Sequence, residues 1–371
     1  MNPMKQYTHD KRIVMTLDAG GTNLRFSALR AGKEVVDSVH KNTCGHDLEK
    51  SLTHIIEGFG EIKKQLDEDP VAISFGFPGP TDYKNGIIGD LINLPAYRGG
   101  VALGPMLEEQ FGIPVFISND ADLFTYGEAI AGILPHINDL LEQKGSSRRY
   151  RNLIGGTFGT GFGGGIAIAG KIIAGDNSAQ AEINRMWNHL YPGYSVEESV
   201  SSKGVRRVYA REAGIPAHDA PTARDIFEIG IGTKEGSINA ARKAYEELGR
   251  AAGNAFAQAA TLIDGLVVIG GGLSGARKLF MPALVKEMNT AFKSFESEMI
   301  ERLEMEVFDL TDEKGLEDFL QDNIIQIDVP FSNKKVLYNP EKKIGVGISL
   351  LGTSRATAIG AYAFAIQKMN Y

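Results

Sequence analysis

A weak internal repeat is the feature that most restricts the fold of this chain. The segment VMTLDAGGTNLRFSALRAGKEVV aligns without a gap with a later segment, so that Gly21-Thr22 falls on Gly159-Thr160. In the same alignment Ala31-Gly32-Lys33 falls on Ala169-Gly170-Lys171. Both copies are predicted to form an apolar strand, a Gly/Thr turn, a second strand, a Gly-Lys turn and a third strand. Two short identities can arise by chance, but the shared order, spacing and strand pattern favour a duplicated domain.

The glycine-rich segment 155–165 raises another possibility, a dinucleotide-binding turn. Residues 159–164 satisfy the pattern G-x-G-x-x-G. However, the following residues, GIAIAGKIIAG, are typical of a strand, a tight turn and a second strand, whereas a Rossmann turn opens a helix. The dense glycines therefore indicate a backbone that turns tightly and passes close to a ligand.

Strand and helix patterns alternate through the rest of each half. Short apolar runs predict strands at 71–79 and 115–120, and one-sided apolar periodicity predicts helices over 46–66 and 237–262. Such alternation after a three-strand meander is typical of an α/β domain.

We therefore predict two similar α/β domains, at 1–121 and 122–355, that face a central cleft. The final helix, at about 356–371, is a candidate to return to the first domain. Two facing Gly/Thr turns would present backbone N–H groups to one anionic ligand, which favours a polyphosphate and hence ATP over NAD. The acidic segment 294–343 is helix-prone, with one strand pattern at IIQIDVP. A solvated helix is its expected form, and packing on a partner subunit is the alternative.

Composition excludes several classes of protein. The 371 residues carry a net charge of −7 and one cysteine, Cys44. The acidic balance gives no indication of a nucleic-acid partner, and a single cysteine excludes both a disulfide framework and a multi-cysteine zinc site. No apolar run reaches the ~20 residues that a membrane span needs. We expect a cytoplasmic protein without a membrane partner.

Four motifs occur in order along most of the chain, from about Ile13 onward: LDAGGTNLRFSAL, SNDAD, GTGFGGGIAIAGKIIAG and VVIGGGLSG. Each is weak alone, but together they resemble the ROK family of sugar kinases, in the superfamily of hexokinases, actin and heat-shock ATPases. The resemblance implies two ribonuclease-H-like, actin-like ATPase domains, the cofactors ATP and Mg²⁺, a monosaccharide substrate and a homodimer.

The resemblance also implies residues for the nucleotide. Asp18 would lie near the metal–phosphate group and hold Mg²⁺ through water, which suits the reluctance of this ion to lose its hydration. The alternative for Asp18 is a solvated carboxylate in a turn. The other residues assigned to phosphate or adenosine are Gly20, Gly21, Thr22, Asn23, Gly159, Thr160, Gly161, Gly270, Gly271 and Gly272.

For the sugar, the resemblance assigns the general base to Asp120, which follows the predicted strand at the end where α/β ligands bind. The alternative is that Asp120 only caps the helix beginning near Ala121. The residues assigned to sugar contacts are Asn93, Asn119, Asp120, Glu182, Arg185 and Glu197.

The chain departs from the family pattern after Glu182. Asn184 and Arg185 replace a glycine and a histidine, and the zinc-binding cysteines of the family are missing, so we expect no zinc site. Glu198 beside Glu197 leaves the register of the later glutamate open. We expect Arg185 either to pair with Glu182 or Glu197, or to recognise an acidic or modified sugar, because a guanidinium suits carboxylate and phosphate better than a neutral hydroxyl.

The sequence thus predicts an ATP-dependent carbohydrate kinase. The alternative is a sugar-binding regulatory protein of the same family without kinase activity. A dehydrogenase would rest on a second G-x-G-x-x-G match at Gly270, Gly272 and Gly275, but no acidic residue follows a second strand at the distance that NAD binding needs.

Overall fold

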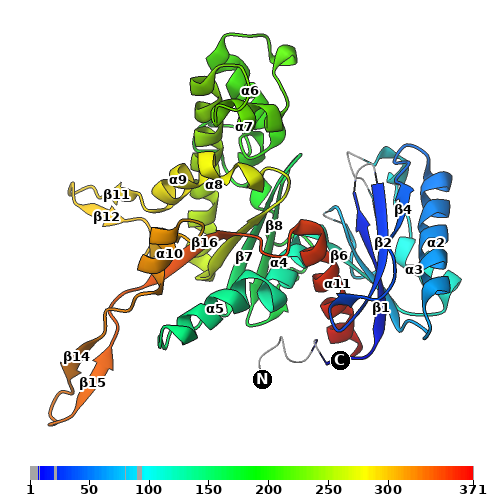
Figure 1. Ribbon diagram of the computed structural model, residues 1–371, viewed down its shortest axis with the longest axis horizontal. Coiled ribbons are helices and arrows are strands. Elements are labelled where there is room, and N and C mark those ends of the chain that lie inside the picture. The colour runs from blue at the N-terminus through cyan, green and yellow to red at the C-terminus, as the bar shows by residue number, and fades with distance from the viewer. Residues whose placement is uncertain (1–6, 8, 21–22, 80, 90–93, 371) are drawn as a thin grey trace. The chain divides into compact units, whose positions relative to one another are not determined.

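The structure is a computed structural model that describes residues 7, 9–20, 23–79, 81–89 and 94–370. Figure 1 shows its elements. The chain divides into two compact units, one comprising 1–135, 163–182 and 349–371 and the other 136–162 and 183–348. The domain boundaries given above stay a prediction.

The first unit is built on a mixed sheet whose described strands are β1 (Ile13–Ala19), β2 (Asn23–Arg30), β3 (Lys33–Glu34), β4 (Val39–Asn42), β5 (Ala72–Phe77) and β6 (Val115–Asn119). Their order is β3-β2-β1-β5-β6, with β4 also paired to β2. β1 pairs antiparallel with β2 and parallel with β5, which pairs parallel with β6. The strands predicted at 71–79 and 115–120 are confirmed.

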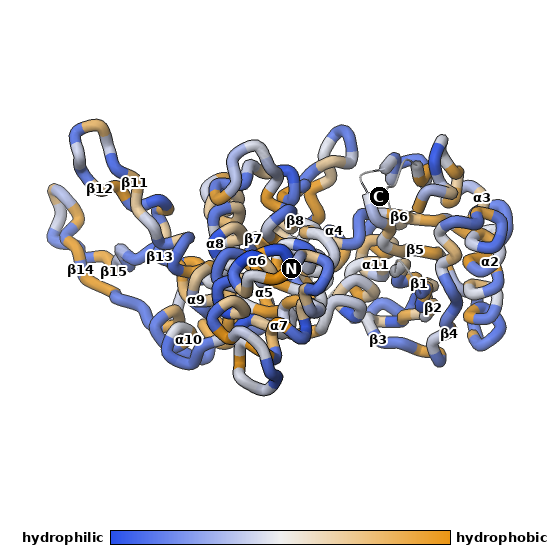
Figure 2. The backbone as a smooth tube through the Cα atoms, turned by 90° about the horizontal axis from the view of Figure 1, so that it is seen from above, coloured by the Kyte–Doolittle hydropathy of each residue, from blue (hydrophilic) through white to orange (hydrophobic). Residues whose placement is uncertain are grey.

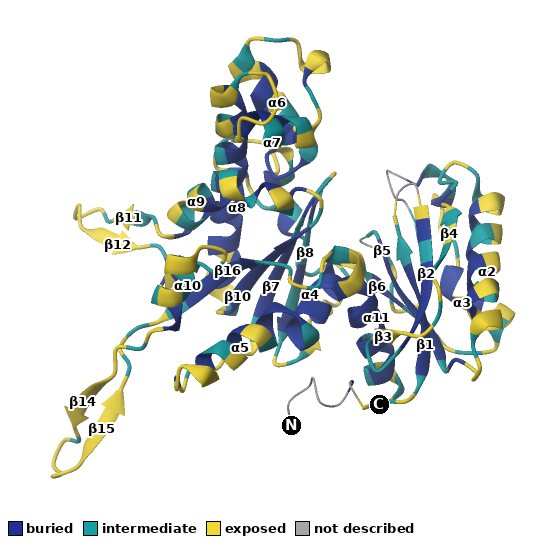
Figure 3. Ribbon diagram, viewed as in Figure 1, coloured by how far each residue is buried: buried dark blue, intermediate teal, exposed yellow. Residues whose placement is uncertain are grey.

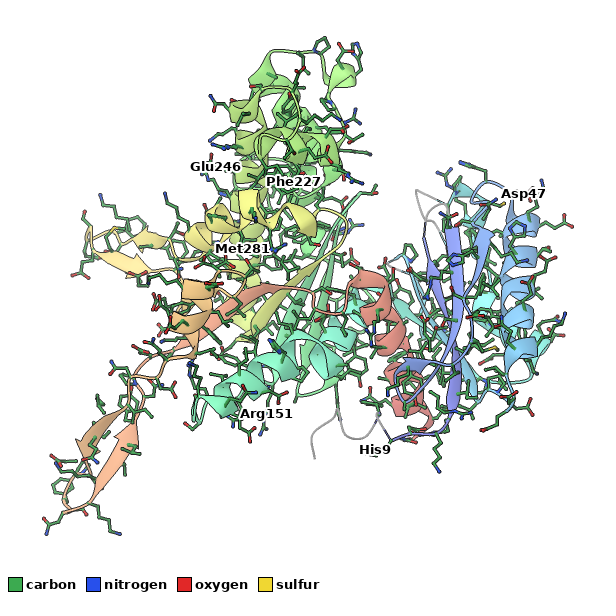
Figure 4. All side chains as sticks on the ribbon, viewed as in Figure 1. His9, Asp47, Arg151, Phe227, Glu246 and Met281 are labelled. Atoms are coloured by element: carbon green, nitrogen blue, oxygen red, sulfur yellow. The ribbon has the colours of Figure 1, made fainter. Side chains whose placement is uncertain are left out.

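Helices cover both faces of this sheet because side chains alternate along each strand. These helices are α2 (Leu48–Gln65), α3 (Leu103–Phe111), α4 (Asp120–Ala131) and α11 (Thr353–Met369). Ile13 and Met15 of β1 pack with α2 and α3, whereas Val14 packs with α4 and α11. Figure 2 shows hydrophobic and hydrophilic residues alternating along α2. Asp47, labelled in Figure 4, caps this helix because its side chain accepts the backbone N–H of Lys50. The helix predicted over 46–66 is therefore confirmed.

The second described sheet has the order β13-β16-β10-β7-β8-β9. Its strands are β7 (Asn152–Phe158), β8 (Phe162–Ile168), β9 (Lys171–Ile172), β10 (Leu266–Gly270), β13 (Glu306–Asp309) and β16 (Lys343–Ile348). β7, β10, β16 and β13 run parallel, and β9 is antiparallel to β8.

A long helix, α8, forms the centre of the second unit. It confirms the helix predicted over 237–262, and its alanine-rich face packs against α6, α7 and α9 in one buried cluster. Figure 3 shows this buried interior in dark blue. The described helices outside the first unit's sheet are α5 (Ile133–Gln143), α6 (Ser202–Ala213), α7 (Ala223–Gly230), α8 (Ile238–Ile263), α9 (Arg277–Met288) and α10 (Glu313–Leu320). No helix among the described residues combines the length and apolarity needed to cross a membrane.

The internal repeat is confirmed in the geometry of its two Gly-Lys turns. Ala31 and Gly32 have φ of 56° and 72°, and Ala169 and Gly170 have φ of 49° and 77°. Both turns join paired strands through two residues, with Arg30 opposite Lys33 in the first and Ile168 opposite Lys171 in the second. Two consecutive positive φ angles define the turn that suits the twist of a hairpin.

The helical interpretation of the acidic segment 294–343 is largely wrong. Only α10 is helical there, whereas β11 (Ala291–Lys293) pairs with β12 (Met299–Glu301), and β14 (Ile325–Asp328) pairs with β15 (Lys335–Tyr338). β13 joins the main sheet beside β16 and buries Val307. Pairing with a distant strand overrides the local helix propensity of this acidic segment. The strand predicted at IIQIDVP is confirmed as β14.

Candidate active site

Asp18 lies at the carboxyl end of β1, where the sheet also presents Gly76 of β5. The two residues are partners in the parallel register, and Asp18 is half-buried. Beyond it, the N–H of Gly20 donates to the carbonyl of Asn23 at 2.9 Å, and the Thr43 hydroxyl donates to the carbonyl of Gly20 at 2.6 Å. These bonds fix both ends of the turn that follows Asp18. Of the other residues expected at the ligands, Gly21, Thr22 and Asn93 lie outside the described residues.

Asp120 is the first residue of α4, directly after β6. Gly76 permits this position, because a Cβ at residue 76 would lie 2.9 Å from the Cα of Asp120. Asp120 is accessible to solvent, yet the protein atoms around it raise the pKa of its carboxyl, and the negative charge of Asp18 raises this pKa further. An accessible carboxylate with a raised pKa is suited to accept a proton from a substrate.

Asn119 is the N-cap residue of α4, and the carboxylate of Asp120 also accepts the N–H of Ala121, at 2.8 Å, a bond that opposes the rise of the Asp120 pKa. The side-chain oxygen of Asn119 accepts two backbone N–H groups of the first helical turn, at 2.8 and 3.3 Å. Its amide nitrogen donates to the hydroxyl of Tyr83 at 3.3 Å, and that hydroxyl donates to the carbonyl of Phe77 at 2.9 Å. Asn119 therefore fixes the helix start that carries Asp120, and its contact with a sugar stays a prediction.

Glu182 belongs to the same unit and is half-buried. Burial is the main cause that raises the pKa of Tyr83 and the pKa of Asp122, and the negative charge of Glu182 adds to both. The Glu182 carboxylate is thus electrostatically coupled to the start of α4. Sequence reasoning missed Tyr83 and Asp122, and the only signal for Asp122 was its place two residues after the candidate base.

The glycine turn at 159–161 joins β7 to β8 and is closed by hydrogen bonds. The N–H of Gly159 donates to the carbonyl of Gly161 at 3.0 Å, and Ser202 donates to the carbonyl of Gly159 through its backbone and its hydroxyl, at 2.8 and 2.9 Å. The carboxylate of Glu197 accepts the N–H of Phe162 at 3.0 Å. A Cβ at Gly161 would lie 2.5 Å from that carboxylate, so glycine is required for this contact. The structure thus places Glu197 against the expected phosphate turn, and its role toward a sugar stays a prediction.

The turn at Gly270–Gly272 lies beside the turn at 159–161, because the parallel strands β7 and β10 end at the same edge of their sheet. Gly271 has a φ of 84°, and a Cβ there would lie 2.3 Å from the carbonyl oxygen of Phe158. The same oxygen accepts the N–H of Leu273 at 2.9 Å. In contrast, a Cβ at Gly272 would meet nothing within 4 Å, so the backbone there is open to a ligand.

Arg185 ends a short 3₁₀ turn, Ile183–Arg185, and is exposed. The amide oxygen of Asn184 is buried and has no hydrogen-bond partner among the described residues. Both expectations for Arg185, pairing with a carboxylate and recognition of an acidic or modified sugar, stay predictions.

The residues present fit a nucleotide and a hydrated metal ion. Gly159 and Gly272 have open space where a side chain would stand, so a ligand can approach the backbone of both turns, while the N–H of Gly159 itself is bonded to the carbonyl of Gly161. Among the described residues, no group of three or more His, Cys, Asp or Glu side chains could hold a metal ion by itself. One carboxylate at Asp18 is the donor set expected for Mg²⁺ that keeps its waters and binds substrate phosphates.

Comparison with known proteins agrees with this arrangement. A family model described as "ROK family" matches residues 14–316. The chain is 25% identical to a glucokinase of Halalkalibacterium halodurans over 70% of its own length and 80% of that protein. It is 31% identical to an N-acetyl-D-glucosamine kinase of Vibrio cholerae, over 47% of this chain and 54% of that protein, or about half of the relative's length.

Solved structures share the fold. A glucokinase from Parabacteroides distasonis is 52% identical, with a TM-score of 0.87 and coverage of 97% of this chain and 99% of that one. A ROK family glucokinase from Streptomyces griseus, solved with glucose and AMPPNP, is 19% identical with a TM-score of 0.61, covering 96% of this chain and 99% of that one. The two α/β units are therefore those of the actin-like ATPase fold, as predicted from the sequence. Since the family model matches most of the chain, the protein belongs to the ROK family.

Proposed function

We propose that the protein is an ATP-dependent sugar kinase, in which Asp120 is the general base for phosphoryl transfer to a monosaccharide hydroxyl. The observation that carries this proposal is the position of Asp120 at the start of α4, where the residue is exposed to solvent while the protein atoms around its carboxyl, and the charge of Asp18, raise its pKa. The relatives named as glucokinases and N-acetyl-D-glucosamine kinases support the class of substrate.

In the proposed step, the carboxylate of Asp120 accepts the proton of the sugar hydroxyl as its oxygen attacks the γ-phosphorus. The new O–P bond forms as the bond from the γ-phosphorus to the bridging oxygen breaks, and ADP leaves with that oxygen. Asn119 holds the helix start in place, and the half-buried Glu182 is the carboxylate proposed to contact sugar hydroxyls.

Within the second unit, the glycine turns at 159–161 and 270–272 would hold the nucleotide. Mg²⁺ bound through Asp18 would neutralise charge on the phosphates. Backbone N–H groups suit this role because they bind anions without adding a competing charge.

The test is ADP release from Mg-ATP with neutral hexoses, N-acetylated hexosamines and sugar acids. We expect turnover on at least one sugar, reduced by roughly 10²–10⁴-fold in Asp120→Asn, the range usual for loss of a general base. Asp139→Asn is the matched control, since Asp139 is exposed on α5, outside the candidate site.

An Asp120→Asn variant with wild-type turnover would overturn the assignment of the base. No turnover on any sugar, with ATP still bound, would favour the alternative of a sugar-binding regulatory protein. A preference for sugar acids would identify Arg185 as a specificity residue, which Arg185→His would then test.

A further inference from the structure

The segment that follows β9 and ends at Glu182 has an unusual backbone for its composition. Ser178 and Ala181 have φ of 53° and 55°, although neither is glycine. Residues in this region of conformational space persist only when surrounding contacts hold them there. Glu182, the candidate sugar ligand, directly follows Ala181, so whatever holds this segment also places Glu182.

Gln180 provides such contacts at both ends of its amide group. Its side-chain oxygen accepts the backbone N–H of Gly175 at 3.1 Å, which closes the segment on itself. Its side-chain nitrogen donates to the carboxylate of Asp122, in the first turn of α4. One side chain thus joins the segment to the helix that begins at Asp120.

The neighbouring part of the chain already packs closely on α4. A Cβ at Gly165 of β8 would lie 2.3 Å from the hydroxyl oxygen of Thr125 and 2.5 Å from the carbonyl oxygen of Ala121. The absence of a side chain at Gly165 therefore lets β8 pack directly against α4. The far end of the segment, near Glu182, is held instead by the hydrogen bond from Gln180.

Asp122 is an unusual anchor because it is only 1% exposed and one of its carboxyl oxygens has no hydrogen-bond partner among the described residues. Burial raises the pKa of Asp122 well above its usual range, and the negative charges of Asp120 and Glu182 raise it further, while the bond from Gln180 opposes the rise. A buried polar atom without a partner costs stability. A buried polar atom without a partner therefore calls for a structural or functional explanation.

We infer that the Asp122–Gln180 hydrogen bond positions the 173–182 segment, so that Glu182 is held ready for the sugar beside the helix that carries Asp120. Neither residue touches the reacting atoms, so both are positioning residues. The inference rests on the proposed kinase function for its kinetic consequence, but its structural consequence can be measured without any activity.

The kinetic test compares Gln180→Ala with wild type. We expect the KM for the sugar to rise about tenfold, the equivalent of one hydrogen bond to a charged or buried carboxyl. The KM for ATP should be unchanged and kcat should stay within about threefold, because the base and the phosphate turns are not altered. Gln143→Ala, at an exposed position at the end of α5, is the matched control and should leave every constant unchanged.

Two variants of Asp122 separate the hydrogen bond from the charge. Asp122→Asn keeps an oxygen that can accept from Gln180 and should keep the sugar KM within about twofold, whereas Asp122→Ala should raise it as Gln180→Ala does. The Asp122→Ala/Gln180→Ala double variant should be no worse than either single variant, because both remove the same bond. Additive losses in the double variant would overturn the inference.

Amide hydrogen exchange of residues 173–182 in the substrate-free protein gives a readout independent of catalysis. Gln180→Ala should exchange faster there, and Asp122→Asn should exchange like wild type. Unchanged exchange in Gln180→Ala, or an unchanged sugar KM, would overturn the inference. A wild-type protein that phosphorylates no sugar would instead overturn the proposed function, and the exchange experiment would still decide the role of Gln180.

Discussion

At the scale of single residues, neighbouring carboxyl groups have different surroundings. Asp120 is accessible, whereas Asp122, two residues further along α4, is 1% exposed. Both have raised pKa values, Asp122 because it is buried and Asp120 because protein atoms surround a carboxyl that still reaches solvent. Accessibility therefore favours Asp120 as the residue that meets a substrate, and burial favours Asp122 as a structural anchor.

The raised pKa of Asp120 predicts the acid side of the pH profile. A general base acts only when it is deprotonated, so kcat/KM for the sugar falls as the pH drops through the pKa of Asp120 in the Mg-ATP complex that binds the sugar. The protein atoms around Asp120 are the main cause that raises this pKa, so the fall should begin above the ordinary aspartate value of about 3.9. The measurement is kcat/KM for the sugar between pH 4 and 8 at saturating Mg-ATP, at about ten pH values. A flat profile down to pH 4 would contradict the assignment.

At the scale of elements, the glycine turns depend on close backbone approach rather than on side chains. Gly271 combines a positive φ with a backbone oxygen at 2.3 Å from its missing Cβ, whereas Gly272 has open space at that place. Adjacent glycines of one motif therefore have different physical roles. The first shapes the turn, and the second leaves room for a ligand.

Alanine at each position tests this difference. Gly271→Ala should lower the free energy of unfolding by about 1–3 kcal/mol, because alanine is strained at this φ and its Cβ would collide with the backbone. Gly272→Ala is the matched control for stability. It should leave the unfolding midpoint unchanged and raise the KM for ATP. Thermal unfolding and ATP kinetics of both variants provide the measurement, and equal loss of stability in the two would refute the distinction.

At the scale of the whole molecule, β14 and β15 form a two-stranded sheet of their own that extends from α10 (Figure 1) and is exposed along both strands (Figure 3). The register places Ile325 opposite Tyr338 and Ile327 opposite Val336, so these four apolar side chains share one face. An isolated hairpin is marginally stable in water, and an apolar face without cover is a common interaction surface. A second copy of the chain would bring an identical apolar face, which a two-fold interface requires.

The homodimer expected from the family resemblance can be tested on this hairpin. Ile325→Ser/Tyr338→Ser should convert a dimer to a monomer in light scattering after gel filtration, because it removes half of the shared apolar face. Gln326→Ser, on the opposite face, is the control and should remain dimeric. A monomeric wild-type protein, or a dimer that survives the double substitution, would show that this face does not mediate dimerisation.

Much of the fold could be predicted from the sequence because its signals are local. The two Gly-Lys turns, at residues 31–33 and 169–171, have the same backbone geometry. The strands and helices with clear apolar periodicity lie where the pattern indicates. Turn geometry and amphipathic periodicity depend on residues close together in the chain. The order of the motifs was likewise sufficient to identify the family.

Tertiary structure decided what depends on distant partners. β13 is a strand within a helix-prone acidic stretch because it pairs with the distant strand β16. The contact of Glu197 with the turn at 159–161, and the bond from Gln180 to Asp122, join residues more than thirty positions apart. No local pattern specifies such pairs, since each depends on where packing brings two segments together. The sequence by itself determined the family and the α/β fold class and predicted the candidate base, and only the packed structure decided which side chains surround that residue.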